Sequence, residues 1–170
     1  TIMGGYGSGW RGARKATVES SLVLSINSLV RKKAIVPGAR TSGSLDWTDS
    51  GNDKPHASVG YEANLVDLGS AWLRLHYKAN GEPVDDRIKL VTTTPRYGGL
   101  RWWFICPLEG PQRRVAKLYL PPGARHFGSR QGHGLTYTSC QESGKERGLF
   151  RHLAAATGMD EEAISELLKD

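Results

Sequence analysis

The sequence contains two cysteines in 170 residues, Cys106 and Cys140. Two thiols are too few for the disulfide framework of a small secreted protein, so reduced and buried thiols are the default interpretation. No apolar run approaches the length of a membrane span, and no basic segment followed by an apolar one precedes a cleavage site. We therefore expect a soluble, cytoplasmic protein that has no membrane partner.

Catalytic signatures are also lacking. There is no Gly-x-Ser-x-Gly pattern, no phosphate-binding Walker loop and no His-Glu-x-x-His pattern. Gly7, Gly9 and Gly12 match Gly-x-Gly-x-x-Gly, but no strand precedes them as a dinucleotide site requires. Asp85 and Asp86 are neighbours on an expected strand, so their carboxylates point to opposite faces. We expect a protein that is not an enzyme and needs no cofactor.

Positive charge is concentrated in two blocks. The formal net charge is +6, yet residues 1–40 carry seven basic and one acidic side chain, and residues 96–151 carry ten and three. The segment 41–95 between them carries five basic and eight acidic side chains, and residues 152–170 carry one and five. Such basic clusters are the electrostatic footprint of a protein that binds a polyanion or an acidic protein surface. Net charge by itself favours the simpler interpretation of a solvated surface.

The residue pattern predicts mostly strands. An apolar run at 21–25 suits a strand and leads into a helix expected at 26–33. From residue 42 onward apolar residues alternate with polar ones, and turn signals separate the runs. The strongest signal is Asn80-Gly81, which is typical of a two-residue hairpin turn. The expected antiparallel meander has strands within 45–47, 57–63, 72–77 and 87–91, and continues with 100–105 and 115–120.

The end of the chain has a helical pattern. Apolar side chains recur at helical spacing within 149–156 and 163–168, with Gly158 and an Asp160 N-cap between them. The second helix is acidic, whereas a helix that meets DNA phosphates should be basic or neutral. We therefore interpret 141–170 as an αα-hairpin that packs on the sheet or on a second copy of the chain in a homodimer.

The segment 101–137 looks like a zinc ribbon that has lost its zinc ligands. A ribbon needs two Cys-x-x-Cys knuckles, because four thiolates around the metal replace a core that so short a segment cannot bury. Here one knuckle begins at Cys106 but has Glu109 in place of its second cysteine, and the other has Ser129 and Gly132. One thiol cannot hold a structural zinc, so we expect no metal.

Motifs near both ends of the chain carry a resemblance. They are Met-Gly-Gly-Tyr-Gly-Ser-Gly at 3–9, Trp-Trp-Phe-x-Cys-Pro at 102–107, Arg-Arg-Val at 113–115, Leu-Tyr-Leu-Pro-Pro-Gly at 118–123 and His-Gly-Leu-Thr-Tyr at 133–137. With them the chain resembles a broad group of short, uncharacterised bacterial proteins that are often found in prophages and mobile elements. The resemblance implies this genomic setting and a ribbon-like region, but no shared activity.

These patterns together predict an α+β fold. Its antiparallel β-meander ends in a degenerate, metal-free zinc-ribbon hairpin, with one short N-terminal helix and a C-terminal αα-hairpin. The expected divisions are a Gly- and Arg-rich arm at 1–16, a sheet region at 17–95, the degenerate ribbon at 96–140 and the helical hairpin at 141–170. We expect all four to form one compact unit.

The basic blocks and a pair of tryptophans predict a binding surface. Trp102 and Trp103 are strand neighbours, so one faces the core and the other faces outward, unless the terminal helices bury both. An outward Trp among arginines suits base stacking with phosphate contacts, or a hot spot in a protein interface. The residues expected to bind are Arg11, Arg14, Lys15, Arg101, Trp102, Trp103, Arg113, Arg114, Arg125 and Arg130.

We therefore expect a non-catalytic binding protein of a phage or mobile element that engages nucleic acid or a nucleoprotein complex through its basic patches. The alternative is a protein-directed inhibitor of a host defence system, similar to an anti-CRISPR protein, whose partner is a host defence protein. A third interpretation is a divergent zinc protein that uses Cys106, His126, His133 and Cys140, although this spacing matches no ribbon or finger. In the ribbon-like region we expect His133 to be a structural, hydrogen-bonding residue.

Overall fold

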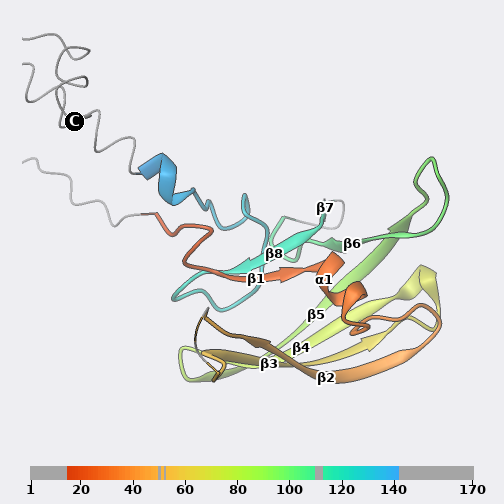
Figure 1. Cartoon of the computed structure of the whole chain (residues 1–170), viewed down its shortest axis with the longest axis horizontal. Coiled ribbons are helices and arrows are strands. Elements are labelled where there is room, and N and C mark those ends of the chain that lie inside the picture. The colour runs from red at the N-terminus through yellow and green to blue at the C-terminus, as the bar shows by residue number, and fades with distance from the viewer. Residues whose placement is uncertain (1–14, 50, 52, 110–112, 142–170) are drawn as a thin grey trace, which may run out of the picture.

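The computed structural model describes residues 15–49, 51, 53–109 and 113–141. Within these residues the chain has a β-rich α+β fold, made mostly of antiparallel sheets with few helices (Figure 1). The expected arm at 1–16 lies outside the described residues except for its last two positions. The expected helical hairpin at 141–170 lies outside them except for its first position. The divisions between these segments stay predictions.

The larger sheet is an antiparallel meander of six strands in the order β2-β3-β4-β5-β6-β7. Its strands are β2 (Arg40–Trp47), β3 (Ala57–Asn64), β4 (Trp72–Ala79), β5 (Glu82–Thr93), β6 (Arg101–Ile105) and β7 (Arg114–Val115), and a short 3-10 turn, η1 (Leu68–Ser70), precedes β4. The turn between β4 and β5 confirms the Asn80-Gly81 prediction. Both residues have positive φ, 53° and 82°, as a type I′ turn requires.

A smaller sheet pairs β1 (Leu22–Ser25) with β8 (Lys117–Leu120), and α1 (Ile26–Arg31) follows β1 directly. This pairing corrects the expectation that 115–120 ends the meander. Arg114 and Val115 alone pair with β6, and the chain then crosses to β1. There Leu118 becomes fully buried, so β8 helps to cover the core. The helix also ends earlier than position 33, because Lys33 has a left-handed φ of 56°.

The core lies between the two sheets. Buried residues of β4, β5 and β6 form one cluster with buried residues of β1, α1, β8 and the segment after β8. Figure 1 shows β1, α1 and β8 on one side of strands β2 to β5. The largest fully buried side chains are Phe104, Phe127, Ile26, Ile35, Leu65, Leu73, Leu75, Ile88, Leu90 and Leu118. Each such side chain stabilises the fold by about 1.5–3 kcal/mol relative to an exposed one. The core therefore covers one face of the larger sheet. The side chains that point away from the core form the opposite face, which we call the outer face.

The outer face carries polar and aromatic side chains that alternate with the buried ones. On β4 and β5 most of the inward residues are buried, whereas their outward neighbours are exposed or half-buried. The register places Trp72 opposite Lys89 and Val91 opposite Trp103, so these four side chains share the outer face. No helix within the described part of the chain has the length and hydropathy that crossing a membrane requires.

Candidate functional site

The outer face holds one of the two neighbouring tryptophans. Trp102 is buried in the core, with 4% of its surface exposed, and Trp103 lies half-buried on the outer face. The ring of Trp103 is fixed at two points. Its Nε1 donates a hydrogen bond to Oγ1 of Thr93 at 2.9 Å, and the guanidinium carbon of Arg101 lies 4.3 Å from the ring centroid. The indole of Trp103 is therefore ordered and partly accessible, and the Arg101 cation lies on its face.

A second tryptophan repeats this arrangement two strands away. The guanidinium carbon of Arg87 lies 4.2 Å from the centroid of Trp72, and Lys89 is the cross-strand partner of Trp72. A hollow of about 390 Å³ opens here, lined by Gly69, Ser70, Ala71, Trp72, Arg87 and Lys89. Arg114 pairs with Ile105 on the same side of β6 as Trp103. We call Trp72, Arg87, Lys89, Arg101, Trp103 and Arg114 the tryptophan patch.

The positive charge of the tryptophan patch is not neutralised by neighbouring carboxylates. Within the described residues, its three arginines and Lys89 make no ion pair. Arg74, farther along β4, differs because its Nε donates to Oδ1 of Asp85 at 2.8 Å and its Nη1 lies 3.8 Å from Glu62. This hydrogen bond lowers the pKa of Asp85 and raises the pKa of Arg74. Arg74 is thus committed to the sheet, and the patch cations remain available for a ligand.

The hairpin between β5 and β6 extends the tryptophan patch. It projects beyond the sheet as a loop (Figure 1) and is exposed at every position from 94 to 100. Tyr97 is 97% exposed and Leu100 is 47% exposed, and Arg96 stands beside Tyr97. Gly98 and Gly99 have φ of 84° and 83°, values that side chains disfavour. The loop therefore presents an aromatic ring and a cation at its tip.

The four positions of the expected knuckles converge on one point. Ser129 N donates to Sγ of Cys106 at 3.3 Å, and Ser129 Oγ donates to Oε2 of Glu109. Gly132 N donates to the same Ser129 Oγ at 2.9 Å, and a Cβ added to Gly132 would lie 3.3 Å from this oxygen. We call Cys106, Glu109, Ser129 and Gly132 the Cys106 cluster. Hydrogen bonds among its own members occupy its centre.

The alternative metal site receives no support from this geometry. Within the described residues, no three His, Cys, Asp or Glu side chains are placed to hold a metal ion, and this holds for Cys106, His126, His133 and Cys140. His126 Nδ1 instead contacts Asp86 at 2.8 Å. His133 Nε2 donates to the carbonyl oxygen of His126 at 3.0 Å. His133 is thus a hydrogen-bonding residue beside the Cys106 cluster, as expected.

The remaining expected binding residues separate into several places. Arg113 and Arg130 line a second hollow beside the Cys106 cluster, described below. Arg125 forms an ion pair with Glu82 at 3.0 Å, near the turn between β4 and β5. Lys15 is exposed, and its carbonyl oxygen accepts a hydrogen bond from Gln141. Arg11 and Arg14 lie outside the described residues.

Two corrections follow for the expected site. The prediction for Trp102 is wrong, because its inward register buries it beside Phe104 and leaves no ring face for a ligand. Trp72, Arg87 and Lys89 were missed, because they belong to the segment 41–95 whose net charge is negative. The signal was nevertheless present in the alternation, since Asp86 falls on the inward side, opposite to Arg87 and Lys89.

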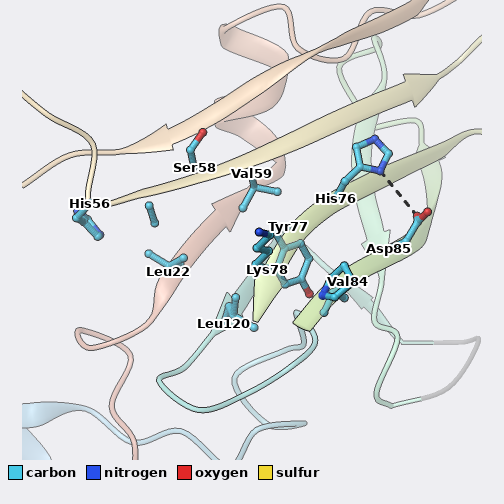
Figure 2. Close-up of a pocket in the computed structure, with 12 residues that line it drawn as sticks. Leu22, His56, Ser58, Val59, His76, Tyr77, Lys78, Val84, Asp85 and Leu120 are labelled. Atoms are coloured by element: carbon cyan, nitrogen blue, oxygen red, sulfur yellow. Dashed lines mark ion pairs between the residues drawn. The ribbon is translucent and has the colours of Figure 1, made fainter. Parts of the chain in front are cut away.

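A larger hollow lies elsewhere, where β1 and β8 meet the ends of β3 and β4. It measures about 940 Å³ (Figure 2), and Val59, Tyr77, Val84, Leu22 and Leu120 are among its lining residues. Its two histidines do not work together. Nδ1 of His76 lies 3.9 Å from Oδ1 of Asp85, whereas His56 stands at the other end of the hollow in Figure 2 and contacts Asp49. The two histidines of the hollow thus make separate, exposed contacts with different aspartates.

Comparisons of the chain with protein-family models, with curated proteins and with solved structures find no match.

Proposed function

We propose that this chain is a non-catalytic binding protein of a phage or mobile element that engages single-stranded nucleic acid through the tryptophan patch. The observation that carries the proposal is the pair of indoles, Trp72 and Trp103, each with an arginine above its ring. Aromatic rings stack on bases of any sequence, and neighbouring cations contact the phosphates. Unpaired bases are required, since bases inside a duplex expose no ring face.

The spacing of the two indole rings supports a nucleic-acid strand that runs across the β-strands of the sheet. One strand, β5, lies between β4 and β6, so Trp72 and Trp103 are at least two strand spacings apart, about 10 Å. At this separation the two rings take different bases of one strand. Arg87, Lys89, Arg101 and Arg114 then lie along the path of its phosphates, and Tyr97 offers a further ring at the hairpin tip.

We also infer that the Cys106 cluster descends from a zinc-ribbon knuckle that has lost its metal. The convergence of Cys106, Glu109, Ser129 and Gly132 supports this, because the positions of all four ligands of a ribbon would surround such a point. Ribbons commonly serve nucleic-acid machines, which adds weight to a nucleic-acid ligand. In place of a metal, the hydrogen bonds of the cluster hold the two knuckle segments together.

The test is the binding of labelled single-stranded DNA and RNA by fluorescence anisotropy. In Trp103→Leu we expect the affinity to fall by about 5- to 150-fold, the equivalent of about 1–3 kcal/mol for one stacked base. Trp103→Phe retains a ring and should stay close to the wild type. Lys89→Gln should weaken binding, whereas Lys32→Gln should not, because Lys32 is an exposed lysine at the end of α1, which packs on the covered side of the sheet.

Salt dependence separates this proposal from adventitious binding. Affinity should fall steeply as salt rises from about 50 to 200 mM, with a shallower slope in Lys89→Gln. The proposal is wrong if no single strand binds at about 50 mM salt, or if Trp103→Leu and Trp103→Phe bind equally well.

A second candidate is the inhibitor of a host defence protein, which the hairpin tip favours. Tyr97 is 97% exposed and stands beside Arg96, and tyrosine and arginine are residue types that dominate protein interfaces. A pull-down from a bacterial lysate, with and without nuclease, decides between the two. A protein complex that survives nuclease and is lost in Tyr97→Ser would replace the nucleic-acid proposal with this one.

A further inference from the structure

A second basic site lies beside the Cys106 cluster. It is a hollow of about 220 Å³ lined by Arg113, Val115, Lys117, Tyr119, Ser129, Arg130, Gln131 and Tyr137. The first four are alternate residues from the position before β7 to β8, and all of them line the hollow. The segment 129–137 forms the opposite wall. We call this hollow the basic pocket.

Arg113 and Arg130 of the basic pocket are oriented by neighbouring side chains, and Arg130 and Lys117 are free of carboxylates. Nη2 of Arg113 donates to Oε1 of Gln131, and Nε of Arg113 lies 3.7 Å from Oε2 of Glu109. The guanidinium carbon of Arg130 lies 5.5 Å from the ring centroid of Tyr137. Within the described residues, Arg130 and Lys117 form no ion pair, so the pocket keeps an excess positive charge.

The wall that carries Arg130 and Gln131 is braced from behind. Ser129 is 4% exposed and bonds Cys106, Glu109 and Gly132, and three backbone hydrogen bonds close the turn that follows it. Tyr119, on the opposite wall, is 8% exposed. Its burial raises the pKa of Tyr119, so its hydroxyl remains a neutral donor at physiological pH. Arg130, Gln131 and Tyr119 are therefore held in place before a ligand arrives.

The size and place of the pocket restrict its ligand. Its volume is below the range of about 300–1,000 Å³ that is typical of small-molecule sites, so it suits one anionic group better than a whole nucleotide. An internal phosphodiester is joined to nucleotides on both sides, so the strand would have to pass into and out of such a small site. A terminal phosphate is joined to a nucleotide on one side only. A terminal phosphate also carries more negative charge, and arginine and lysine are the side chains that bind it best.

The pocket lies next to the tryptophan patch. Arg114 belongs to the patch and its neighbour Arg113 lines the pocket, and both are carried by the edge strand of the six-stranded sheet or the residue before it. A strand that crosses Trp103 and Arg114 can therefore turn around this edge and place its end in the pocket.

We propose that the basic pocket binds the terminal phosphomonoester of a nucleic-acid strand whose preceding nucleotides lie on the tryptophan patch. This inference rests on the proposed nucleic-acid function and names the part of the ligand that its second site recognises. Lys117 and Arg130 supply the charge, and Arg113, oriented by Gln131, supplies directed donors.

The test compares oligonucleotides of one sequence that carry a 5′-phosphate, a 3′-phosphate or hydroxyl groups at both ends. We expect one of the phosphorylated forms to bind about ten- to a hundred-fold more tightly than the hydroxyl form. The Lys117→Gln/Arg130→Gln double variant should lose this advantage, so that its affinity for the phosphorylated form falls by more than its affinity for the hydroxyl form. Lys32→Gln serves as the matched control, and inorganic phosphate is titrated as a competitor and, alone, by calorimetry.

Each outcome separates the pocket from the patch. If all three oligonucleotides bind equally, the inference about the pocket is wrong and the proposed function stands. If the double variant weakens all three equally, the pocket contacts the strand without reading its end, which also overturns the inference. If no oligonucleotide binds, the proposed function fails first. Inorganic phosphate that then binds the wild type but not the double variant would assign the pocket to free phosphate, and no binding would refute both.

Discussion

Replacing Tyr77 by Phe tests the contact that ties β4 to the segment after β8. The side chain is 9% exposed, and its ring meets Phe127 edge-on at a centroid distance of 5.5 Å. Its hydroxyl lies 2.8 Å from both Oδ2 of Asp86 and the carbonyl oxygen of Arg125. Burial, with the hydrogen bond to Asp86, raises the pKa of Tyr77, so the hydroxyl stays a protonated donor.

The expected magnitude follows from what Tyr77→Phe removes. The ring and its apolar contacts remain, so the loss is one hydrogen bond to a charged acceptor, about 1.5–3 kcal/mol. Asp86 keeps its contacts with Nδ1 of His126 at 2.8 and 3.0 Å, which places the effect toward the lower end of this range. For a chain of this length each kcal/mol lowers Tm by about 2–4 °C.

The assay is urea unfolding followed by circular dichroism and tryptophan fluorescence. Tyr97→Phe is the matched control, because the same oxygen is lost from a side chain that is 97% exposed. We expect the control to change the free energy of unfolding by less than about 0.5 kcal/mol. If Tyr77→Phe is as small as the control, the hydroxyl does not stabilise the fold and the reasoning is refuted.

Two further predictions concern the Cys106 cluster and His133, which lies beside it. The triple variant Glu109→Cys/Ser129→Cys/Gly132→Cys should bind zinc stoichiometrically, because with Cys106 it places four thiols around one point. Cobalt absorption and elemental analysis measure this, with the wild type as control, and a folded variant without metal would contradict it. Burial lowers the pKa of His133 from its ordinary value of 6.5, so the unfolded state takes up the proton first. The free energy of unfolding should therefore fall as pH drops below about 6.5, with a shallower fall in His133→Gln; equal slopes in urea titrations would refute this.

Local features of the structure could be predicted because they depend on neighbours in the chain. The period of two placed the strands of the meander, and Asn80-Gly81 marked the turn that their positive φ values permit. Alternation also separated Asp85 from Asp86, which contact Arg74 and His126 on opposite sides of β5.

The choice between Trp102 and Trp103 needed the tertiary structure. Apolar residues occupy both series of alternate positions in β6, with Trp102 and Phe104 in one and Trp103 and Ile105 in the other. The pattern therefore predicts a strand without saying which series faces inward. Pairing with β5 decides it, because Phe104 lies opposite Leu90, which is itself fully buried.

The sequence alone determined the α+β character, the strand segments, the turns and the basic blocks, because propensity, alternation and charge are local properties. Only the tertiary structure decided which strands pair and which side chains become neighbours. It paired β8 with β1, joined Trp72 and Arg87 of an acidic segment to Trp103 and Arg101 of a basic one, and separated Arg113 from Arg114. These choices depend on backbone hydrogen bonds and burial between residues far apart in the chain, and a local pattern is compatible with several such pairings.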